Sequence, residues 1–171
     1  GFPRSFLAED DRASSDWRED FIRTYLERDL PQLGVGVPAP TMRRLWTMLA
    51  HLHGQTWNAS RLARSMGVAD TTARRYVDHL EATYMVRTLS PWHTNVGKRQ
   101  VKAPKVYLSD SGLLHTLLGL THRVELERHP QLGASWEGFA LAETVRALGV
   151  PWSRCHFWAT HGGAELDLFV D

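Results

Sequence analysis

Residues 58–80 have the spacing of two short helices joined by a tight turn. Small and apolar residues recur where two crossing helices must pack against each other, at Leu62, Ala63, Met66, Val68, Ala73 and Tyr76. Gly67 lies at the turn, where the backbone usually needs a positive φ that glycine adopts without a Cβ clash. Asn58 precedes the first helix and can cap it. The segment therefore predicts a helix-turn-helix.

The second helix of this unit presents side chains that suit nucleic acid. Its outer face carries Thr71, Arg74 and Arg75, between Asp70 and Asp78. An arginine fork can bond a guanine edge at two points or clamp a phosphate, so Thr71, Arg74 and Arg75 are candidate DNA contacts. The alternative is a three-helix bundle that uses the same packing to bind protein.

The net charge of +1 conceals an uneven distribution along the 171 residues. Residues 58–105 hold nine basic and three acidic side chains, whereas residues 1–30 have a net charge of −3 and residues 106–171 a net charge of −4. Neutralisation of phosphates supplies most of the sequence-independent affinity for DNA. The basic centre therefore favours a DNA-binding module.

The segments around this unit predict a winged helix. Apolar spacing predicts helices over residues 17–30, ended by Pro31, and over 42–54, with a loop at 34–40. β-rich runs at 85–92 and 105–110 flank a loop that carries Lys98, Arg99 and Lys102, which would be the wing and touch the DNA backbone. We expect a helical linker region at 1–40 and a winged helix-turn-helix at 41–108.

Residues 109–171 predict the opening of an α/β domain. Ser109 or Asp110 can open a helix, and a second helix at 136–149 offers side chains for burial. These are Phe139, Ala140, Ala142, Val145 and Leu148. Strands are predicted at 155–160 and 164–171, with a hairpin turn at 161–163. Because no third strand follows, we expect a truncated nuclease-like domain within an α+β fold.

Four carboxylates in this region raise the question of a metal site. Glu137 and Glu143 fall on the helix, and strand alternation places Glu165 and Asp167 on one face of the last strand. Nucleases of the restriction-endonuclease type begin their Mg²⁺ site in this way, but they also need a lysine on a third strand. No lysine follows Lys105. The alternative is that Glu165 and Asp167 simply lie on the polar face of a half-buried strand.

Several other classes of protein are disfavoured. No apolar run approaches the roughly 20 residues of a membrane span, and the single Cys155 excludes an internal disulfide framework. The spacing of His51 and His53 does not suit zinc, and neither a phosphate-binding loop nor a nucleophile elbow is present. These features predict a cytoplasmic protein without a membrane partner. Trp57 and Trp92 are the tryptophans best placed for a surface role.

The chain resembles the DUF4143 family, the C-terminal region of prokaryotic AAA-type ATPases. The resemblance rests on TYLERDL at 24–30, HGQ at 53–55, DHLEATYMV at 78–86, NVGKRQVKAPKVYLSDSGL at 95–113, WEGF at 136–139 and GGAELDLFVD at 162–171. It implies a winged helix, a restriction-endonuclease-like domain, and an ATPase core outside this sequence, which would bind ATP and Mg²⁺. This chain, which lacks an initiator methionine, would then be a fragment. Glu137 and Asp167 match the family's acidic motif and are the candidate catalytic and Mg²⁺-binding residues.

Three hypotheses follow. The first is binding of duplex DNA by Thr71, Arg74 and Arg75 in the major groove, with Lys98, Arg99 and Lys102 on phosphates. The second is a metal-dependent nuclease whose active site is incomplete in this sequence. The third is a module for protein interaction, which docks on the ATPase domain of the same protein or forms a homo-oligomer.

Overall fold

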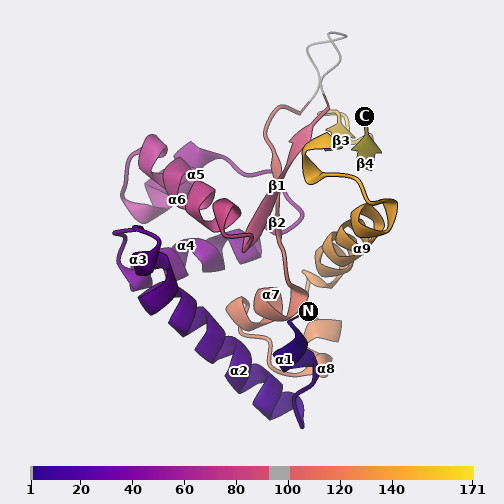
Figure 1. Cartoon of the computed structure of the whole chain (residues 1–171). Coiled ribbons are helices and arrows are strands. Elements are labelled where there is room, and N and C mark those ends of the chain that lie inside the picture. The colour runs from indigo at the N-terminus through magenta and orange to yellow at the C-terminus, as the bar shows by residue number, and fades with distance from the viewer. Residues whose placement is uncertain (1, 93–100) are drawn as a thin grey trace.

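The N-terminal part of the protein is helical. The computed structural model describes residues 2–92 and 101–171. It begins with α1 (Pro3–Phe6), α2 (Asp11–Thr24) and α3 (Leu30–Gln32), and a π-helical turn at Tyr25–Asp29 joins the last two. Asp10 caps α2 by accepting a hydrogen bond from the Ala13 N–H at 2.7 Å. In Figure 1, α2 forms the long lower edge of the molecule.

The predicted end of this helix at Pro31 is wrong. The π-helical turn closes when the Leu30 N–H bonds the carbonyl of Tyr25, five residues back. Pro31 then lies in the first turn of α3, where the missing N–H costs little, and the helix reaches Gln32.

Three helices and a β-hairpin follow. The helices are α4 (Ala39–His51), α5 (Ala59–Met66) and α6 (Asp70–Ala82), and the strands are β1 (Val86–Pro91) and β2 (Lys105–Leu108). Figure 1 shows α4, α5 and α6 gathered on one side of the two strands. The predicted helix-turn-helix and both predicted strands are thus confirmed as secondary structure.

The C-terminal part begins with α7 (Ser111–Leu117), α8 (Arg123–Glu127) and α9 (Leu132–Leu148). Asp110, one of the two residues that the sequence offered as the start of this helix, caps α7 by accepting a 2.7 Å hydrogen bond from the Leu113 N–H. A 3₁₀ turn (Trp152–Arg154) then leads into β3 (Cys155–Ala159) and β4 (Glu165–Val170). The hairpin turn predicted between these strands is confirmed, with Gly163 at φ +90°.

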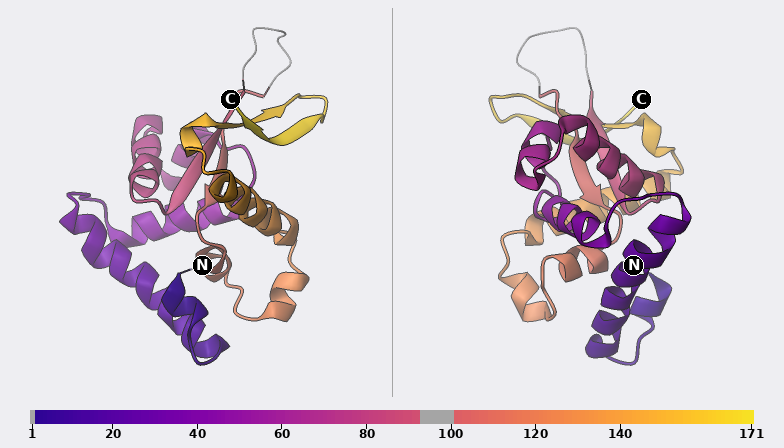
Figure 2. Two further views of the ribbon diagram at one scale, coloured as in Figure 1. Left: turned by 45° about the vertical axis from the view of Figure 1, so that its right-hand side comes forward. Right: turned by 90° about the vertical axis from the view of Figure 1, so that its left-hand side faces the viewer.

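All four strands form one sheet in the order β2-β1-β3-β4. β1 pairs antiparallel with β2 from Val86↔Leu108 to Leu89↔Lys105, and β3 pairs antiparallel with β4. The two hairpins meet through a short parallel pairing, Ser90↔His156 and Pro91↔Phe157. Figure 2 shows β3 and β4 turned away from β1 and β2, with α9 beside them. The α+β fold class is confirmed.

Two groups of buried side chains stabilise this arrangement. The larger joins α2 and α4–α7 around Trp46, whose ring meets that of Tyr25 edge to face at 5.3 Å between centroids. The smaller lies between α9 and the sheet, at Leu89, Tyr107, Leu141, Val145, Cys155 and Phe157. Burial of such apolar side chains contributes roughly 1.5–3 kcal/mol each.

The buried face of α9 differs from the prediction. Phe139 and Leu148 are 46% and 58% exposed, and the helix turns Ser135, Gly138 and Leu141 inward, together with the predicted Val145. Small residues face inward because His53 and Tyr107 come close to the helix: a Cβ on Gly138 would lie 2.3 Å from His53 Nε2 and 3.1 Å from Tyr107 Cδ1.

Among the described residues, every helix is too short or too polar to span a lipid bilayer.

Candidate nucleic-acid interface

The helix-turn-helix forms through local contacts that the sequence encodes. Asn58 Oδ1 accepts hydrogen bonds from the N–H groups of Ser60 at 2.8 Å and Arg61 at 3.3 Å, so it caps α5 as predicted. Gly67 ends α5 in the left-handed region, with φ +71° and ψ +33°. This cap and this turn set the angle at which α6 leaves α5.

α6 buries one face and exposes the other. Ala73, Val77 and Leu80 are fully buried, whereas Thr71, Arg74 and Arg75 are exposed. Glu81 fixes β1 against the helix, since its Oε1 accepts hydrogen bonds from the N–H of Thr88 at 3.1 Å and from its hydroxyl at 2.7 Å. The three predicted contact residues therefore lie on the solvent side of a helix that is held firmly on its other side.

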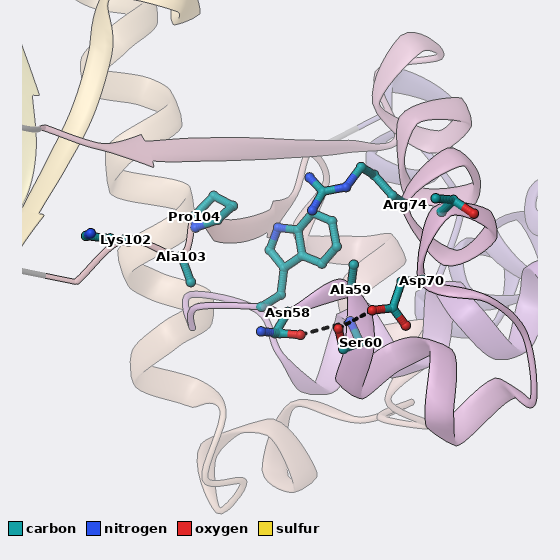
Figure 3. Close-up of a pocket in the computed structure, with 10 residues that line it drawn as sticks. Asn58, Ala59, Ser60, Asp70, Arg74, Lys102, Ala103 and Pro104 are labelled. Atoms are coloured by element: carbon teal, nitrogen blue, oxygen red, sulfur yellow. Dashed lines mark hydrogen bonds between the residues drawn. The ribbon is translucent and has the colours of Figure 1, made fainter.

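A hollow of about 630 Å³ lies beside the N-terminal ends of α5 and α6; we call it the α6 groove. Its lining residues are Trp57, Asn58, Ala59, Ser60, Asp70, Thr71, Arg74, Lys102, Ala103 and Pro104. Figure 3 shows Arg74 and Lys102 on opposite sides of it. A main-chain bond of 3.0 Å from the Trp57 N–H to the Pro104 carbonyl holds the two walls together.

The groove also contains one acidic side chain. Asp70 accepts a hydrogen bond from the hydroxyl of Ser60, so one helix is tied to the next across the floor of the groove. Trp57, which the sequence suggested for a surface role, is only 6% exposed. That prediction is wrong because the segment 53–57 runs against β2, with bridges His53↔Val106 and Thr56↔Lys105.

The basic residues of this region differ from most of the other arginines of the protein. Most arginines elsewhere pair with a carboxylate, as Arg12 does with Asp16 and Arg43 with Glu19. Within residues 2–92 and 101–171, a second set of exposed basic side chains makes no ion pair or hydrogen bond. This set consists of Arg61, Arg64, Arg74, Arg75 and Lys102, which gather in this region, and of the two separate residues Arg4 and Arg128. Its cations remain available for an external anion.

Two of the predicted wing residues, Lys98 and Arg99, lie outside the described residues. The third, Lys102, is exposed on the wall of the α6 groove.

A cluster of charged side chains forms around Lys105, the first residue of β2; we call it the carboxylate cluster. The Lys105 Nζ lies 2.5 Å from Glu165 Oε1, 3.2 Å from Glu137 Oε1 and 3.5 Å from Asp167 Oδ1. Tyr107 donates its hydroxyl to Glu137 Oε1 at 2.7 Å. The structure thus brings Glu137 and Asp167 to one ammonium group, together with Glu165. Glu143 lies elsewhere and pairs with Arg146.

Lys105 keeps its charge in this setting although the residue is only 5% exposed. Burial lowers the pKa of its ammonium, but the hydrogen bonds and charges of Glu165 and Glu137 outweigh burial, and the net pKa is raised. Burial also raises the pKa of the Tyr107 phenol, as does its bond to Glu137. At neutral pH the cluster therefore holds a cationic lysine and a neutral tyrosine among its carboxylates.

Lys105 was not predicted at this site, because the nuclease pattern places its lysine on a third strand after the hairpin. Lys105 reaches β4 because the parallel pairing of β1 with β3 joins two hairpins that are far apart in sequence. One signal was present, since Lys105 and Tyr107 alternate in a strand that is otherwise apolar. In the part of the chain that the structure describes, no three His, Cys, Asp or Glu side chains converge closely enough to bind a metal ion.

His53 is buried next to this cluster. Its Nδ1 accepts the Leu108 N–H at 3.0 Å, and its ring meets that of Tyr107 edge to face at 5.4 Å. Burial lowers the pKa of His53 to about 4, so the imidazole is neutral at pH 7. Its Nε2 lies against Gly138 and has no side-chain hydrogen-bond partner among the described residues.

Two curated relatives share the whole length of this chain. They are the uncharacterized proteins Mb2031c of Mycobacterium bovis and Rv2008c of Mycobacterium tuberculosis, each 56% identical over 171 residues. The chain spans 38% of the length of each relative. A solved structure described as transcriptional regulator PA3341 is similar with a TM-score of 0.31 at 21% identity, covering 79% of this chain and 96% of that one.

The comparison with family profiles corrects the resemblance that the sequence suggested. A different family matches, over residues 1–123. The assignment to DUF4143 is therefore wrong. The expectation of an attached AAA-type ATPase core with bound ATP rested on that assignment and has no support. The profile covers well over half of the sequence, and the chain belongs to the family described as a domain of unknown function, DUF8612.

Proposed function

We propose that this chain binds duplex DNA as a winged helix, with residues 41–108 as the DNA-binding unit. In this proposal α6 is the recognition helix and enters the major groove, where Thr71, Arg74 and Arg75 meet base edges or phosphates. Lys102 contacts the backbone from the base of the wing, and Lys98 and Arg99 are proposed to extend this contact along the loop.

The observation that carries the proposal is the set of unpaired cations beside the α6 groove. A protein surface usually neutralises exposed arginines with neighbouring carboxylates, as Arg23 with Asp20 and Arg123 with Glu127 do here. The side chains of Arg74, Arg75 and Lys102 have no such partner among the described residues. Unpaired cations around a groove attract phosphates, and release of the phosphates' counterions drives binding.

The proposal is tested by fluorescence anisotropy with a labelled mixed-sequence duplex. The Arg74→Ala/Arg75→Ala variant should bind at least tenfold more weakly than the wild type at low salt. The magnitude of its slope of log K against log salt should fall by about 2, because two phosphate neutralisations are lost. A matched control is Arg12→Ala/Arg123→Ala, which removes the same charge from α2 and α8. Equal losses in the two variants would contradict the recognition-helix assignment.

A second candidate function is metal-dependent cleavage of DNA at the carboxylate cluster. It is favoured by one observation: the Lys105 Nζ lies 3.2 Å from Glu137 Oε1 and 3.5 Å from Asp167 Oδ1, so two carboxylates and a lysine, the residue types of a restriction-endonuclease-like site, come together. Carboxylate oxygens are the donors that Mg²⁺ prefers, so Glu137 and Asp167 would hold the ion. A bound Mg²⁺ would polarise the scissile phosphate. Lys105 would then turn from the carboxylates toward that phosphate.

This second function is tested by incubating supercoiled plasmid with the protein and Mg²⁺ or Mn²⁺. Nicking that is lost in Asp167→Asn and in Glu137→Gln, but kept in Glu143→Gln, is the expected result. Glu143 is the control because it lies on the same helix and outside the cluster. An inert wild type, or nicking that survives both substitutions, would contradict the assignment.

A further inference from the structure

A second hollow adjoins the α6 groove; we call it the α5 hollow. It measures about 480 Å³ and lies between the C-terminal end of α4, the outer side of α5 and residue 103. Its lining residues are Met48, His51, Leu52, Thr56, Trp57, Asn58, Arg61, Leu62, Ser65 and Ala103. It shares Trp57, Asn58 and Ala103 with the α6 groove, so the two hollows meet at the cap of α5.

The lining of the α5 hollow has one sign of charge. Arg61 is its charged residue, His51 lies on its rim, and no lining residue is acidic. Thr56 and Ser65 add hydroxyl groups, and Met48 and Leu52 provide apolar surface. This combination suits a ligand that has both an anionic group and an apolar ring face.

Arg61 is available for such a ligand. Its side chain is exposed and makes no ion pair or hydrogen bond within residues 2–92 and 101–171. Arg64, one turn further along α5, is also exposed and unpaired in that part of the chain, yet it lines neither hollow. The two arginines are therefore a matched pair that differs in position.

We propose that the α5 hollow is a second DNA-contact site, which takes the sugar–phosphate backbone that flanks the segment bound at the α6 groove. Arg61 binds a phosphate there, and the apolar surface of Met48 and Leu52 packs against a deoxyribose. The backbone passes Asn58 and Ala103, where the hollows meet. This inference rests on the proposed DNA binding and adds the direction in which the footprint extends.

The experiment is a duplex-length series measured by anisotropy with four proteins: wild type, Arg61→Ala, Arg64→Ala and Arg74→Ala/Arg75→Ala. Added flanking base pairs should raise the affinity of the wild type and of Arg64→Ala until the flank reaches the α5 hollow. Arg61→Ala should lose about tenfold on the longest duplex, the value of one charge-assisted contact, and little on the shortest. Its salt slope should fall in magnitude by about 1. Arg61→Lys should recover most of the loss.

The outcomes separate this inference from the proposed function. Equal affinities of Arg61→Ala and Arg64→Ala on every duplex, while Arg74→Ala/Arg75→Ala binds weakly, would overturn the α5 hollow alone. Failure of the wild type to bind any duplex, or full binding by Arg74→Ala/Arg75→Ala, would overturn both. Thermal melting of each variant checks folding, and no change is expected because both α5 arginines are exposed and unpaired.

Discussion

Lys102 and Lys105 lie three residues apart on the segment that enters β2, but they have opposite environments. Lys102 is exposed on the wall of the α6 groove, whereas Lys105 is buried among carboxylates from α9 and β4. One short segment therefore joins the proposed DNA-binding surface to the carboxylate cluster. If DNA occupies the groove, its backbone lies near the carboxylate cluster.

Removal of the Lys105 ammonium should destabilise the protein at neutral pH. In Lys105→Met the three carboxylates lose their shared cation and repel one another. We expect a loss of about 2 kcal/mol at pH 7, less than the roughly 3–5 kcal/mol of a fully buried broken pair, because the carboxylates are partly exposed. Urea unfolding at pH 7 measures the loss.

A double-mutant cycle with Glu165→Gln isolates the pairwise contribution. Glu165 makes the shortest of the three contacts, so part of the Lys105→Met loss should be relieved when Glu165 is also neutral. Strict additivity of the two substitutions would mean that the contact contributes nothing to stability.

Gly138 should not tolerate a side chain. A Cβ there would lie 2.3 Å from His53 Nε2, so Gly138→Ala must displace a buried imidazole at a cost of about 3 kcal/mol. Gly133→Ala is the matched control on the same helix, because open space surrounds its Cβ position, and it should stabilise α9 by up to ~1 kcal/mol. Thermal unfolding of the two variants gives the comparison. A neutral Gly138→Ala would contradict the close packing of His53 on α9.

His53 should make stability fall under mildly acidic conditions. The pKa of His53 is lowered from 6.5 to about 4, so between these values the unfolded chain binds a proton that the native state does not. The contribution of the neutral His53 to the unfolding free energy is complete above pH 6.5. It declines by up to about 3 kcal/mol as the pH falls to about 4. Chemical unfolding from pH 7 to pH 4 measures the decline, which should be smaller in His53→Gln. An equal decline in that variant would assign it to other groups.

Tyr84 should be a site where glycine stabilises the protein. It follows α6 with φ +62°, in the left-handed region that disfavours a Cβ, and its side chain is exposed. Tyr84→Gly should therefore raise the unfolding free energy by about 1 kcal/mol, whereas Tyr84→Ala, which keeps the Cβ, should not. A calorimetric comparison in which alanine stabilises as much as glycine would show that backbone strain is not the cause.

The features that the sequence predicted correctly are local. Asn58 begins α5 and Gly67 ends it through contacts within a few residues, so both ends of the helix can be predicted from neighbouring residues in the sequence. The cap of α7 at Asp110 is of the same kind. Even the shared face of Glu165 and Asp167 follows from strand alternation alone, and both contact Lys105.

The features that the sequence did not predict depend on contacts between residues far apart in the chain. No feature of the sequence near Lys105 predicts that β1 pairs with β3. That pairing is what brings Lys105 to Glu165. The inner face of α9 was predicted from its large apolar residues, but the close approach of His53 and Tyr107 requires Gly138 there instead and leaves Phe139 outside.

Amide chemical-shift mapping of the ¹⁵N-labelled protein is the sharpest test of DNA binding at α6 and its groove. On titration with a short mixed-sequence duplex at low salt, shifts should concentrate at residues 58–61, 70–75 and 101–104, with α2 and α8 unaffected. Shifts confined to other elements, or none at saturating duplex, would contradict it.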